Sequence, residues 1–329
     1  MRVMILGAAG MIGRKLVERM ARDGGIAGTA VDHLLLADVI EPPEPDGFSV
    51  PVETVATDLS APGAAERLLS SRPDLVFHLA AIVSGEAEAD LPKGYRVNLD
   101  GTRALLDAIR AEHERDPSWC PRVVYSSSLA VFGGALPDEI DDDFAPTPQT
   151  SYGTQKLMGE LLLADYSRRG ILRGVGIRLP TIVVRPGKPN RAASGFYSGI
   201  IREPLAGLPA VLPVPDTLRH WMTSPRSAVG FLLHAATLDQ AALDGRPNLT
   251  MPGVSVTVAE QIEALREIAG DKAVALIRRE PDPAVLDLVS GWAQRFAPRR
   301  AAALGFTAEQ HFIDMVRAHV ADDLGGRIG

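Results

Sequence analysis

The sequence of 329 residues lacks several features that would assign it to particular classes of protein. Its one cysteine, Cys120, excludes an intrachain disulfide, and its place beside Trp119 in an expected loop favours an inert thiol over a nucleophile. Lysine and arginine form no block and the net charge is -7, which argues against a surface that binds nucleic-acid phosphates. No apolar stretch approaches the roughly 18 residues that cross a bilayer. We therefore expect neither nucleic acid nor a membrane as a partner.

The first residues combine Arg2 with a short apolar stretch, as a secretory signal does. Glycines interrupt that stretch, and Arg14 and Lys15 follow at once, so we expect no signal peptide and a cytoplasmic location. With 46% hydrophobic residues, the chain is long enough to bury a large core as one domain or two lobes.

Short apolar runs alternate with helical patterns in the first half of the chain. Uninterrupted runs such as 34–38 fit strands that helices cover on both faces. The pattern predicts an α/β protein with a doubly wound parallel sheet of the Rossmann type. The expected strands are 2–6, 34–38, 52–56, 74–79, 122–126 and 174–178, and the expected helices between them are 11–22, 61–71, 96–113 and 151–169.

After about residue 180, prolines crowd the sequence and strand periodicity fades, which predicts a smaller, loop-rich C-terminal lobe. We expect residues 1–180 to form the sheet domain, with parts of 226–252 returning to it, and 181–329 to form mostly the lobe. The later expected elements are helices at 226–238, 257–269 and 308–323 and a strand at 247–251. The acidic run 138–143 is expected to be a solvated loop rather than a metal site.

Gly7, Gly10 and Gly13 stand between the first expected strand and the helix after it. Glycine at these positions permits a tight turn, lets a pyrophosphate approach the backbone and allows close helix packing, while the helix N-terminus offers free N–H groups to the anion. Asp38 ends the second strand, where a carboxylate accepts hydrogen bonds from an adenosine ribose and repels a 2′-phosphate. These residues predict a dinucleotide site that favours NAD over NADP.

Other strand ends give weaker indications. Asp58 is placed to contact the adenine amino group, but a residue that only forms a turn would look the same. Ala80 and Ala81 are small enough for a cofactor to pass the end of the fourth strand. His78 has no second metal-ligand residue near it on its own face, so we expect a buried structural histidine and no metal site.

Hydroxyl and ammonium groups follow at the fifth strand and on the next helix. Ser128 ends the run of serines 126–128, two of which we expect to be only a polar strand end. Tyr152 and Lys156 are four apart and share a helix face, so the ammonium favours the phenolate form of the tyrosine. Such a pair alone is commonly an exposed pair, but together with the glycines it predicts hydride transfer. Tyr152 then takes the alcohol proton, Lys156 supports it and holds the nicotinamide ribose, and Ser128 binds the reacting oxygen.

Together these motifs resemble the extended short-chain dehydrogenase/reductase family, which includes NAD-dependent epimerases and dehydratases. The resemblance covers nearly the whole chain and rests on the three glycines, Asp38, Asp58, residues 78–81 and 131–133, Asn98, Ser128, Tyr152 and Lys156. It implies that domain 1–180 binds NAD and that the lobe binds the substrate. Further contacts with NAD are expected from Ala9, Met11, Ile12, Leu59, Leu79, Asn98, Leu179 and Thr181.

Segments at 84–90, 151–156, 178–182, 185–190 and 219–221 resemble a branch of the family that acts on D-erythronate. This resemblance implies oxidation of the 2-hydroxyl of a four-carbon sugar acid to the 2-oxo acid. The expected substrate contacts are Ser84, Glu86, Ser128, Lys188, Asn190, Arg219 and His220. Arg219 suits a carboxylate and equally a surface ion pair, and His220 equally fits a packed histidine.

Two other functions stay open at the level of the sequence. A nucleotide-sugar 4-epimerase uses the same hydride chemistry without net release of NADH. A non-catalytic NAD-binding module is the third hypothesis, although it has no need for Ser128, Tyr152 and Lys156. Dehydration is disfavoured because Leu129 and Ala130 stand where dehydratases of the family carry Asp-Glu. A homodimer remains open.

Overall fold

The computed structural model describes residues 1–187 and 194–329, which form two compact units. Unit 1 comprises Met1–Val131, Thr150–Leu179 and Val229–Thr250. Unit 2 comprises Phe132–Gln149, Pro180–Ala228 and Met251–Gly329.

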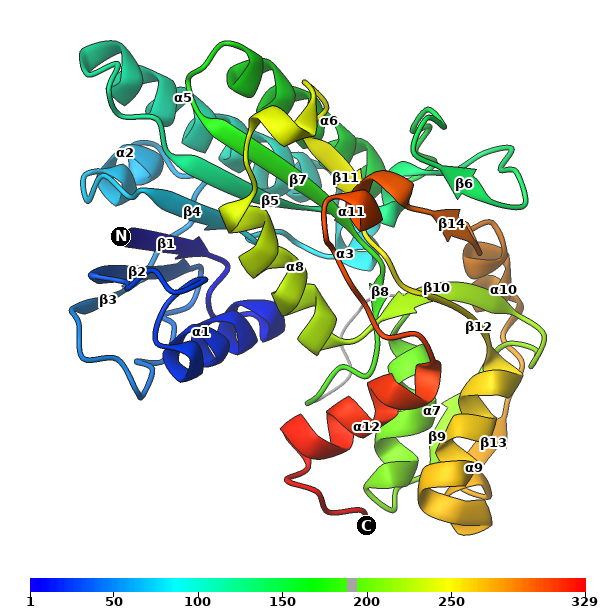
Figure 1. Cartoon of the computed structure of the whole chain (residues 1–329). Coiled ribbons are helices and arrows are strands. Elements are labelled where there is room, and N and C mark those ends of the chain that lie inside the picture. The colour runs from blue at the N-terminus through cyan, green and yellow to red at the C-terminus, as the bar shows by residue number, and fades with distance from the viewer. Residues whose placement is uncertain (188–193) are drawn as a thin grey trace. The chain divides into compact units, whose positions relative to one another are not determined.

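Unit 1 is built on a seven-stranded parallel sheet with strand order β11-β7-β5-β4-β1-β2-β3 (Figure 1). The order reverses between β1 and β4, which is where ligands bind in open α/β sheets. Its strands are β1 (Arg2–Leu6), β2 (His33–Asp38), β3 (Val52–Ala56), β4 (Leu75–His78), β5 (Arg122–Ser128), β7 (Arg173–Leu179) and β11 (Asn248–Thr250). The α/β class and the doubly wound parallel sheet expected from the sequence are confirmed.

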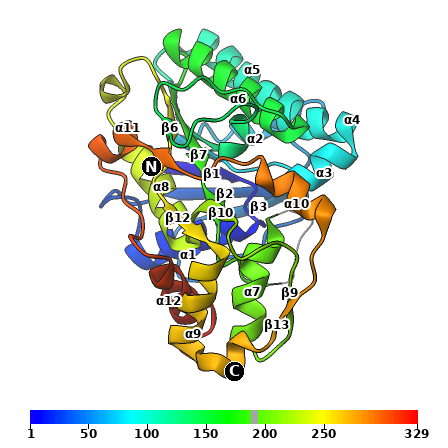
Figure 2. The ribbon, with the colours of Figure 1, turned by 90° about the vertical axis from the view of Figure 1, so that its right-hand side faces the viewer.

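Helices cover both faces of this sheet, α2, α5 and α6 on one face and α1 and α8 on the other (Figures 1 and 2). Apolar residues of α2, α5 and α6 share one core cluster with the sheet, including Leu68, Leu105 and Leu163. The unit contains α1 (Met11–Asp23), α2 (Ala64–Leu69), α3 (Ser84–Ala89), α4 (Leu91–Gly94), a π-helix (Tyr95–Asp100), α5 (Gly101–Arg115), η2 (Leu129–Val131), α6 (Ser151–Arg168), most of α8 (Pro225–Thr237) and η3 (Ala241–Leu243).

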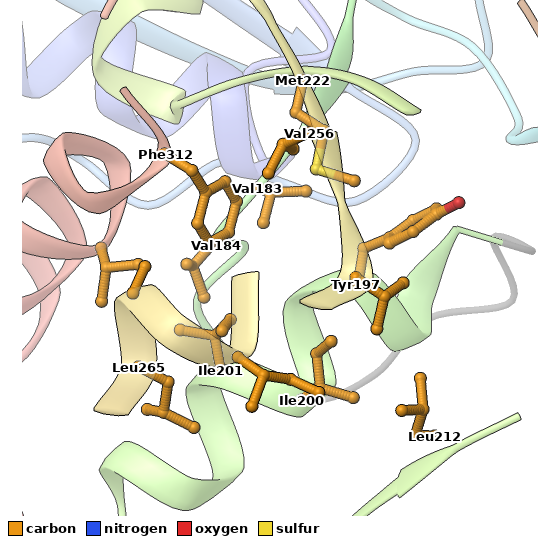
Figure 3. Packing of buried hydrophobic residues seen from close by; sticks show 14 of the residues in the cluster. Val183, Val184, Tyr197, Ile200, Ile201, Leu212, Met222, Val256, Leu265 and Phe312 are labelled. Atoms are coloured by element: carbon orange, nitrogen blue, oxygen red, sulfur yellow. The ribbon is translucent and has the colours of Figure 1, made fainter. Parts of the chain in front are cut away.

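Unit 2 combines small sheets with helices around a second core. Buried side chains of α7, α9 and α12 meet those of the strands, as Ile201, Leu265 and Met222 show (Figure 3). Its elements are β6 (Ile140–Asp141), β8 (Thr181–Ile182), α7 (Gly195–Leu205), β9 (Ala210–Leu212), β10 (Arg219–Thr223), β12 (Val254–Thr257), α9 (Val258–Val274), β13 (Ile277–Arg279), α10 (Pro283–Ser290), β14 (Phe296–Ala297), α11 (Arg299–Ala303) and α12 (Phe312–Asp323).

Residues 132–149 group with unit 2, whereas the sequence placed them within 1–180. The acidic run in this stretch is also more than the solvated loop we expected, because β6 within it pairs in parallel with β14. The Asp142 carboxylate accepts a hydrogen bond from the Arg300 N–H at 2.8 Å. This pairing joins segments that lie about 150 residues apart, and local sequence patterns do not report such contacts.

Some elements were not expected from the sequence. The segment after β4, taken as a loop, contains α3. The first residues of the helix expected at 96–113 belong to a π-helical turn at Tyr95–Asp100, and α5 begins only at Gly101. Such turns are rare and are frequently found at functional sites. Within residues 1–187 and 194–329, no helix has the length and apolarity needed to cross a membrane.

Candidate active site

The glycine turn after β1 lies against the backbone that follows β4. Gly7 has φ 86°, in the left-handed region that glycine adopts readily. A Cβ on Gly7 would lie 2.7 Å from the Ala80 nitrogen, and a Cβ on Gly13 would lie 2.4 Å from the Gly7 carbonyl oxygen. Any larger residue at either position therefore forces the backbone apart. The turn leads directly into α1, whose first N–H groups have no partner within the helix and suit an anion.

The Asp38 carboxylate is fixed beside this turn. Oδ2 accepts a hydrogen bond from the Ala9 N–H at 2.9 Å, and Oδ1 accepts one from the Val39 N–H at 2.7 Å. Each oxygen keeps a second lone pair for a ribose hydroxyl. The two residues after Asp38 are apolar and largely exposed, Val39 at 64% and Ile40 at 60%, so they supply no positive charge for a 2′-phosphate.

Asp58 and Leu59 have roles in the fold itself. The Asp58 carboxylate accepts hydrogen bonds from the Ser60 hydroxyl at 2.6 Å and the Ser60 N–H at 2.9 Å, and Arg96 lies 3.3 Å away. The Ser60 hydrogen bonds, with Arg96, hold the pKa of Asp58 below its usual value. Leu59 packs into the core of unit 1. In the structure Asp58 is thus a turn residue, and its contact with adenine stays a prediction.

Asn98 lies in the π-helix and connects two parts of the site. Its Oδ1 accepts a hydrogen bond from the Ile82 N–H at 2.9 Å, and its Nδ2 donates to Gln155 Oε1 at 2.8 Å. The side chain is 1% exposed. Asn98 therefore ties the segment after β4 to α6, the helix of Tyr152 and Lys156. The sequence indicated Asn98 but not Gln155, which no local pattern distinguishes.

Ser128, Tyr152 and Lys156 all belong to unit 1. Thr150 caps α6 by accepting a hydrogen bond from the Gly153 N–H at 3.1 Å, which fixes the turn that carries Tyr152. The Lys156 ammonium is buried and donates to the Ser126 carbonyl at 2.8 Å. It lies 5.8 Å from the centre of the Tyr152 ring and 4.9 Å from that of Tyr125.

Burial lowers the pKa of Lys156 to about 7, and the Glu160 carboxylate opposes that shift. The Ser128 hydroxyl oxygen accepts a hydrogen bond from the Ala130 N–H at 3.2 Å, which leaves its own proton to be donated elsewhere. The other two serines point to the protein: Ser126 donates to the His78 carbonyl and Ser127 to Glu160.

The sequence did not indicate the ion pair between Glu160 and Arg178, which lies next to these residues. Glu160 is 1% exposed and receives three hydrogen bonds from the Arg178 guanidinium, at 2.9, 3.2 and 2.8 Å. The spacing Tyr152, Lys156, Glu160 on one helix face was the available signal. The partner on β7 was not visible, because it depends on how the sheet meets the helix.

The remaining expected contacts in unit 1 lie near the ends of β4 and β7. The Leu79 N–H donates to the Leu6 carbonyl, so Leu79 continues the sheet, and Leu179 pairs in register with Ser128. Ser84 begins α3, and Glu86 forms an ion pair with Lys93 at 2.5 Å. His78 is buried and its Nε2 lies 2.8 Å from the Thr102 hydroxyl, as a structural histidine requires. No group of metal-ligating side chains occurs among the described residues.

The residues expected in the lobe belong to unit 2. Thr181 Oγ1 lies 2.6 Å from His220 Nε2, and the His220 ring stacks on Tyr197 with centres 5.3 Å apart. Arg219 donates to the Ser255 carbonyl at 2.8 Å and lies 3.5 Å from Glu260. Both residues thus have structural partners, and their contacts with a substrate stay predictions. Lys188 and Asn190 lie outside the described residues.

Comparison with known proteins identifies the family. The model of the NAD dependent epimerase/dehydratase family matches residues 3–225. Two curated relatives are named D-erythronate dehydrogenase. The chain is 44% identical to that of Cupriavidus necator, with 98% of both chains covered, and 39% identical to that of Haemophilus influenzae, with 98% of this chain and 100% of the relative covered.

A solved structure, described as the nucleoside-diphosphate-sugar epimerase from Agrobacterium tumefaciens, is 59% identical to this chain. It covers 100% of this chain and 96% of its own, with a TM-score of 0.98. The family match extends over more than half of the chain and includes the glycine turn, Asp38, Ser128, Tyr152 and Lys156. The chain therefore belongs to the NAD-dependent epimerase/dehydratase family.

Proposed function

We propose that the protein is an NAD-dependent dehydrogenase that oxidises the 2-hydroxyl of a small sugar acid, with D-erythronate as the first candidate. Two full-length relatives named D-erythronate dehydrogenase support this substrate. The observation that carries the chemistry is the buried Lys156 ammonium beside Tyr152, on a helix that also faces the end of β5. The lack of Asp-Glu after Ser128 is consistent with oxidation rather than dehydration.

The residues around the glycine turn fit the dinucleotide, since Gly7 and Gly13 allow the tight turn into the N-terminus of α1, whose free N–H groups suit a pyrophosphate. When bound, NAD supplies the hydride acceptor. Asp38 receives the ribose hydroxyls, and its charge favours NAD over NADP. Tyr152 takes the proton of the substrate alcohol, the Lys156 ammonium stabilises the phenolate, and Ser128 donates to the substrate oxygen.

The test is NAD reduction, followed at 340 nm, across a panel of C4 to C6 aldonates that includes both epimers at C2. We expect D-erythronate to give the highest kcat/KM, and the 2-oxo acid to be the product. Failure of every aldonate to reduce NAD would contradict the proposal. The cytoplasmic location and a homodimer remain predictions, the latter open to a measurement of mass in solution.

A nucleotide-sugar 4-epimerase is the second candidate, favoured by the name of the 59% identical solved structure. The two functions differ in what happens to the cofactor. An epimerase retains tightly bound NAD and interconverts a nucleotide sugar with no net NADH, whereas a dehydrogenase releases NADH in proportion to product. Incubation with UDP-glucose and analysis of the sugar product therefore separates them.

A further inference from the structure

Glu160 is buried one helical turn beyond Lys156 on α6 and receives hydrogen bonds from two strands. Its Oε1 accepts from the Ser127 hydroxyl at 2.5 Å and from Arg178 Nε at 2.9 Å, and its Oε2 accepts from Arg178 Nη2 at 2.8 Å. A buried carboxylate is costly unless such partners compensate for its lost hydration. The carboxylate therefore joins α6 to both β5 and β7.

Ser127 of β5, which donates a hydrogen bond to Glu160, lies between Ser126 and Ser128. Ser126 precedes Ser127, and its carbonyl accepts the hydrogen bond from the Lys156 ammonium. Ser128 follows it and ends β5. Ser127 therefore links Glu160 to the strand end that holds Lys156 on one side and presents Ser128 on the other.

The charges around Lys156 also single out Glu160. Neighbouring titratable groups come from α6, β5 and β4, and they are Tyr152, Glu160, Tyr125 and His78. Of these four groups, Glu160 is the one with a carboxylate, which can carry a negative charge near the Lys156 ammonium. Burial lowers the pKa of Lys156 to about 7, and Glu160 acts in the opposite direction. Loss of this counter-charge should therefore lower the pKa of Lys156 further.

We propose that Glu160 is a positioning residue for this centre: it holds the end of β5 against α6 through Ser127 and Arg178 and favours the ammonium form of Lys156. The proposal rests on the proposed function, in which Lys156 acts as a cation beside Tyr152. Glu160 acts through Ser127, Arg178 and Lys156, and not on the substrate or the cofactor.

The experiment measures the protonation of Lys156 directly. The chain contains five lysines, so labelling with ε-¹³C-lysine gives few NMR signals, and Lys156→Arg assigns the one of interest. We expect Glu160→Gln to lower the titration midpoint of Lys156 by about one pH unit or more, because the carboxylate charge is lost. The alkaline limb of the kcat/KM profile should move in the same direction, while NAD affinity stays within about threefold. An unchanged midpoint in the folded variant overturns the proposal.

Controls separate charge from folding. Asp165→Asn removes one negative charge from an exposed position of the same helix and should leave the midpoint of Lys156 in place. Glu160→Gln removes the negative charge that pairs with the partly buried Arg178, which can destabilise the fold. The double variant with Arg178→Met removes both charges of the pair, and the midpoint of Lys156 is measured in it if the single variant does not fold. We expect the double variant to fold and to keep the lowered midpoint; a wild-type midpoint there overturns the proposal. Because the titration needs no substrate, its outcome is distinguishable from a failure of NAD reduction.

Discussion

Gly159 of α6 faces the Tyr125 phenol of β5 so closely that a Cβ on the glycine would lie 2.4 Å from Tyr125 Oη. The Tyr125 ring is 1% exposed, and the Lys156 ammonium lies over it. The absence of a side chain at Gly159 thus allows α6 to approach the sheet at the level where Lys156 crosses Tyr125. A helix interior would ordinarily favour alanine over glycine by about 1 kcal/mol.

Gly159→Ala should therefore destabilise the protein by about 1–3 kcal/mol, because the added methyl group overpacks a rigid contact. Gly230→Ala is the matched control: Gly230 lies in α8 and a Cβ there meets nothing within 4 Å, so this change should be neutral or stabilising. Urea unfolding midpoints of both variants provide the measurement. Adding Tyr125→Phe to Gly159→Ala removes the nearest clashing atom and leaves Tyr125 Cζ at 2.7 Å, so we expect part of the lost stability to return. Failure to recover any stability would count against the packing argument.

Tyr152→Phe should keep NAD affinity and lose about 10²- to 10⁴-fold in kcat, because the ring and its packing remain while the proton acceptor is gone. NAD binding is measured by fluorescence titration and turnover by NADH formation. A variant that retains more than half of the wild-type turnover would remove Tyr152 from its role as base.

Asp38→Ala should weaken NAD binding by about tenfold to a hundredfold and narrow its advantage over NADP, since the ribose hydrogen bonds and the repulsion of a 2′-phosphate both disappear. Asp38→Asn is the informative companion. It keeps an acceptor for the Ala9 N–H and removes the charge, so its main effect should be improved use of NADP. Kinetic constants with both cofactors give the comparison, and an unchanged preference in both variants would place the ribose elsewhere.

Arg219→Met should raise KM for D-erythronate by about tenfold to a hundredfold with NAD binding nearly unchanged, if the guanidinium binds the substrate carboxylate as we predict. Glu260→Gln serves as a control, because it removes the ion-pair partner and leaves the guanidinium. Loss of stability in both variants with an unchanged KM would assign Arg219 to the fold, and Lys188 would become the next candidate.

Two buried histidines should make the folded state sensitive to mild acid. Burial lowers the pKa of His78 and of His220 to about 3, so between pH 3 and 6.5 the unfolded chain binds protons that the folded protein does not. Stability is therefore lost as the pH falls below 6.5, by roughly 2 kcal/mol per histidine at pH 5. Urea unfolding between pH 7 and 5 measures this slope. His78→Gln should reduce it, with the same substitution at the exposed His311 as a control for the change of residue.

The sequence indicated much of unit 1 because its signals are local. Glycines between a strand and a helix, an acid at a strand end and apolar runs of strand length each follow from the geometry of neighbouring residues. The strand over residues 52–56 and the start of α6 at Ser151 agree with the residues expected. Unit 2 was less predictable, since its strands are short and their pairing depends on distant segments, as in β6 and β14.

The same distinction applies to the candidate site. Tyr152 and Lys156 were recognisable from their spacing, whereas the connection of Glu160 with Arg178 arises where a helix crosses a strand. His220 shows the limit most clearly. Its neighbours Thr181, Tyr197 and Trp292 come from three separate segments, so the sequence could not decide between a substrate contact and a packed ring.

The position of β11 at the edge of the large sheet has a consequence for synthesis on the ribosome. β11 pairs with β7, yet it follows β7 by about 70 residues, which at about 5–20 residues per second takes several seconds to translate. During that interval β7 is an edge strand with unpaired backbone groups, the kind of edge that promotes association between chains. A fragment that ends near residue 180 should therefore aggregate in light-scattering measurements, even though it contains Ser128, Tyr152 and Lys156.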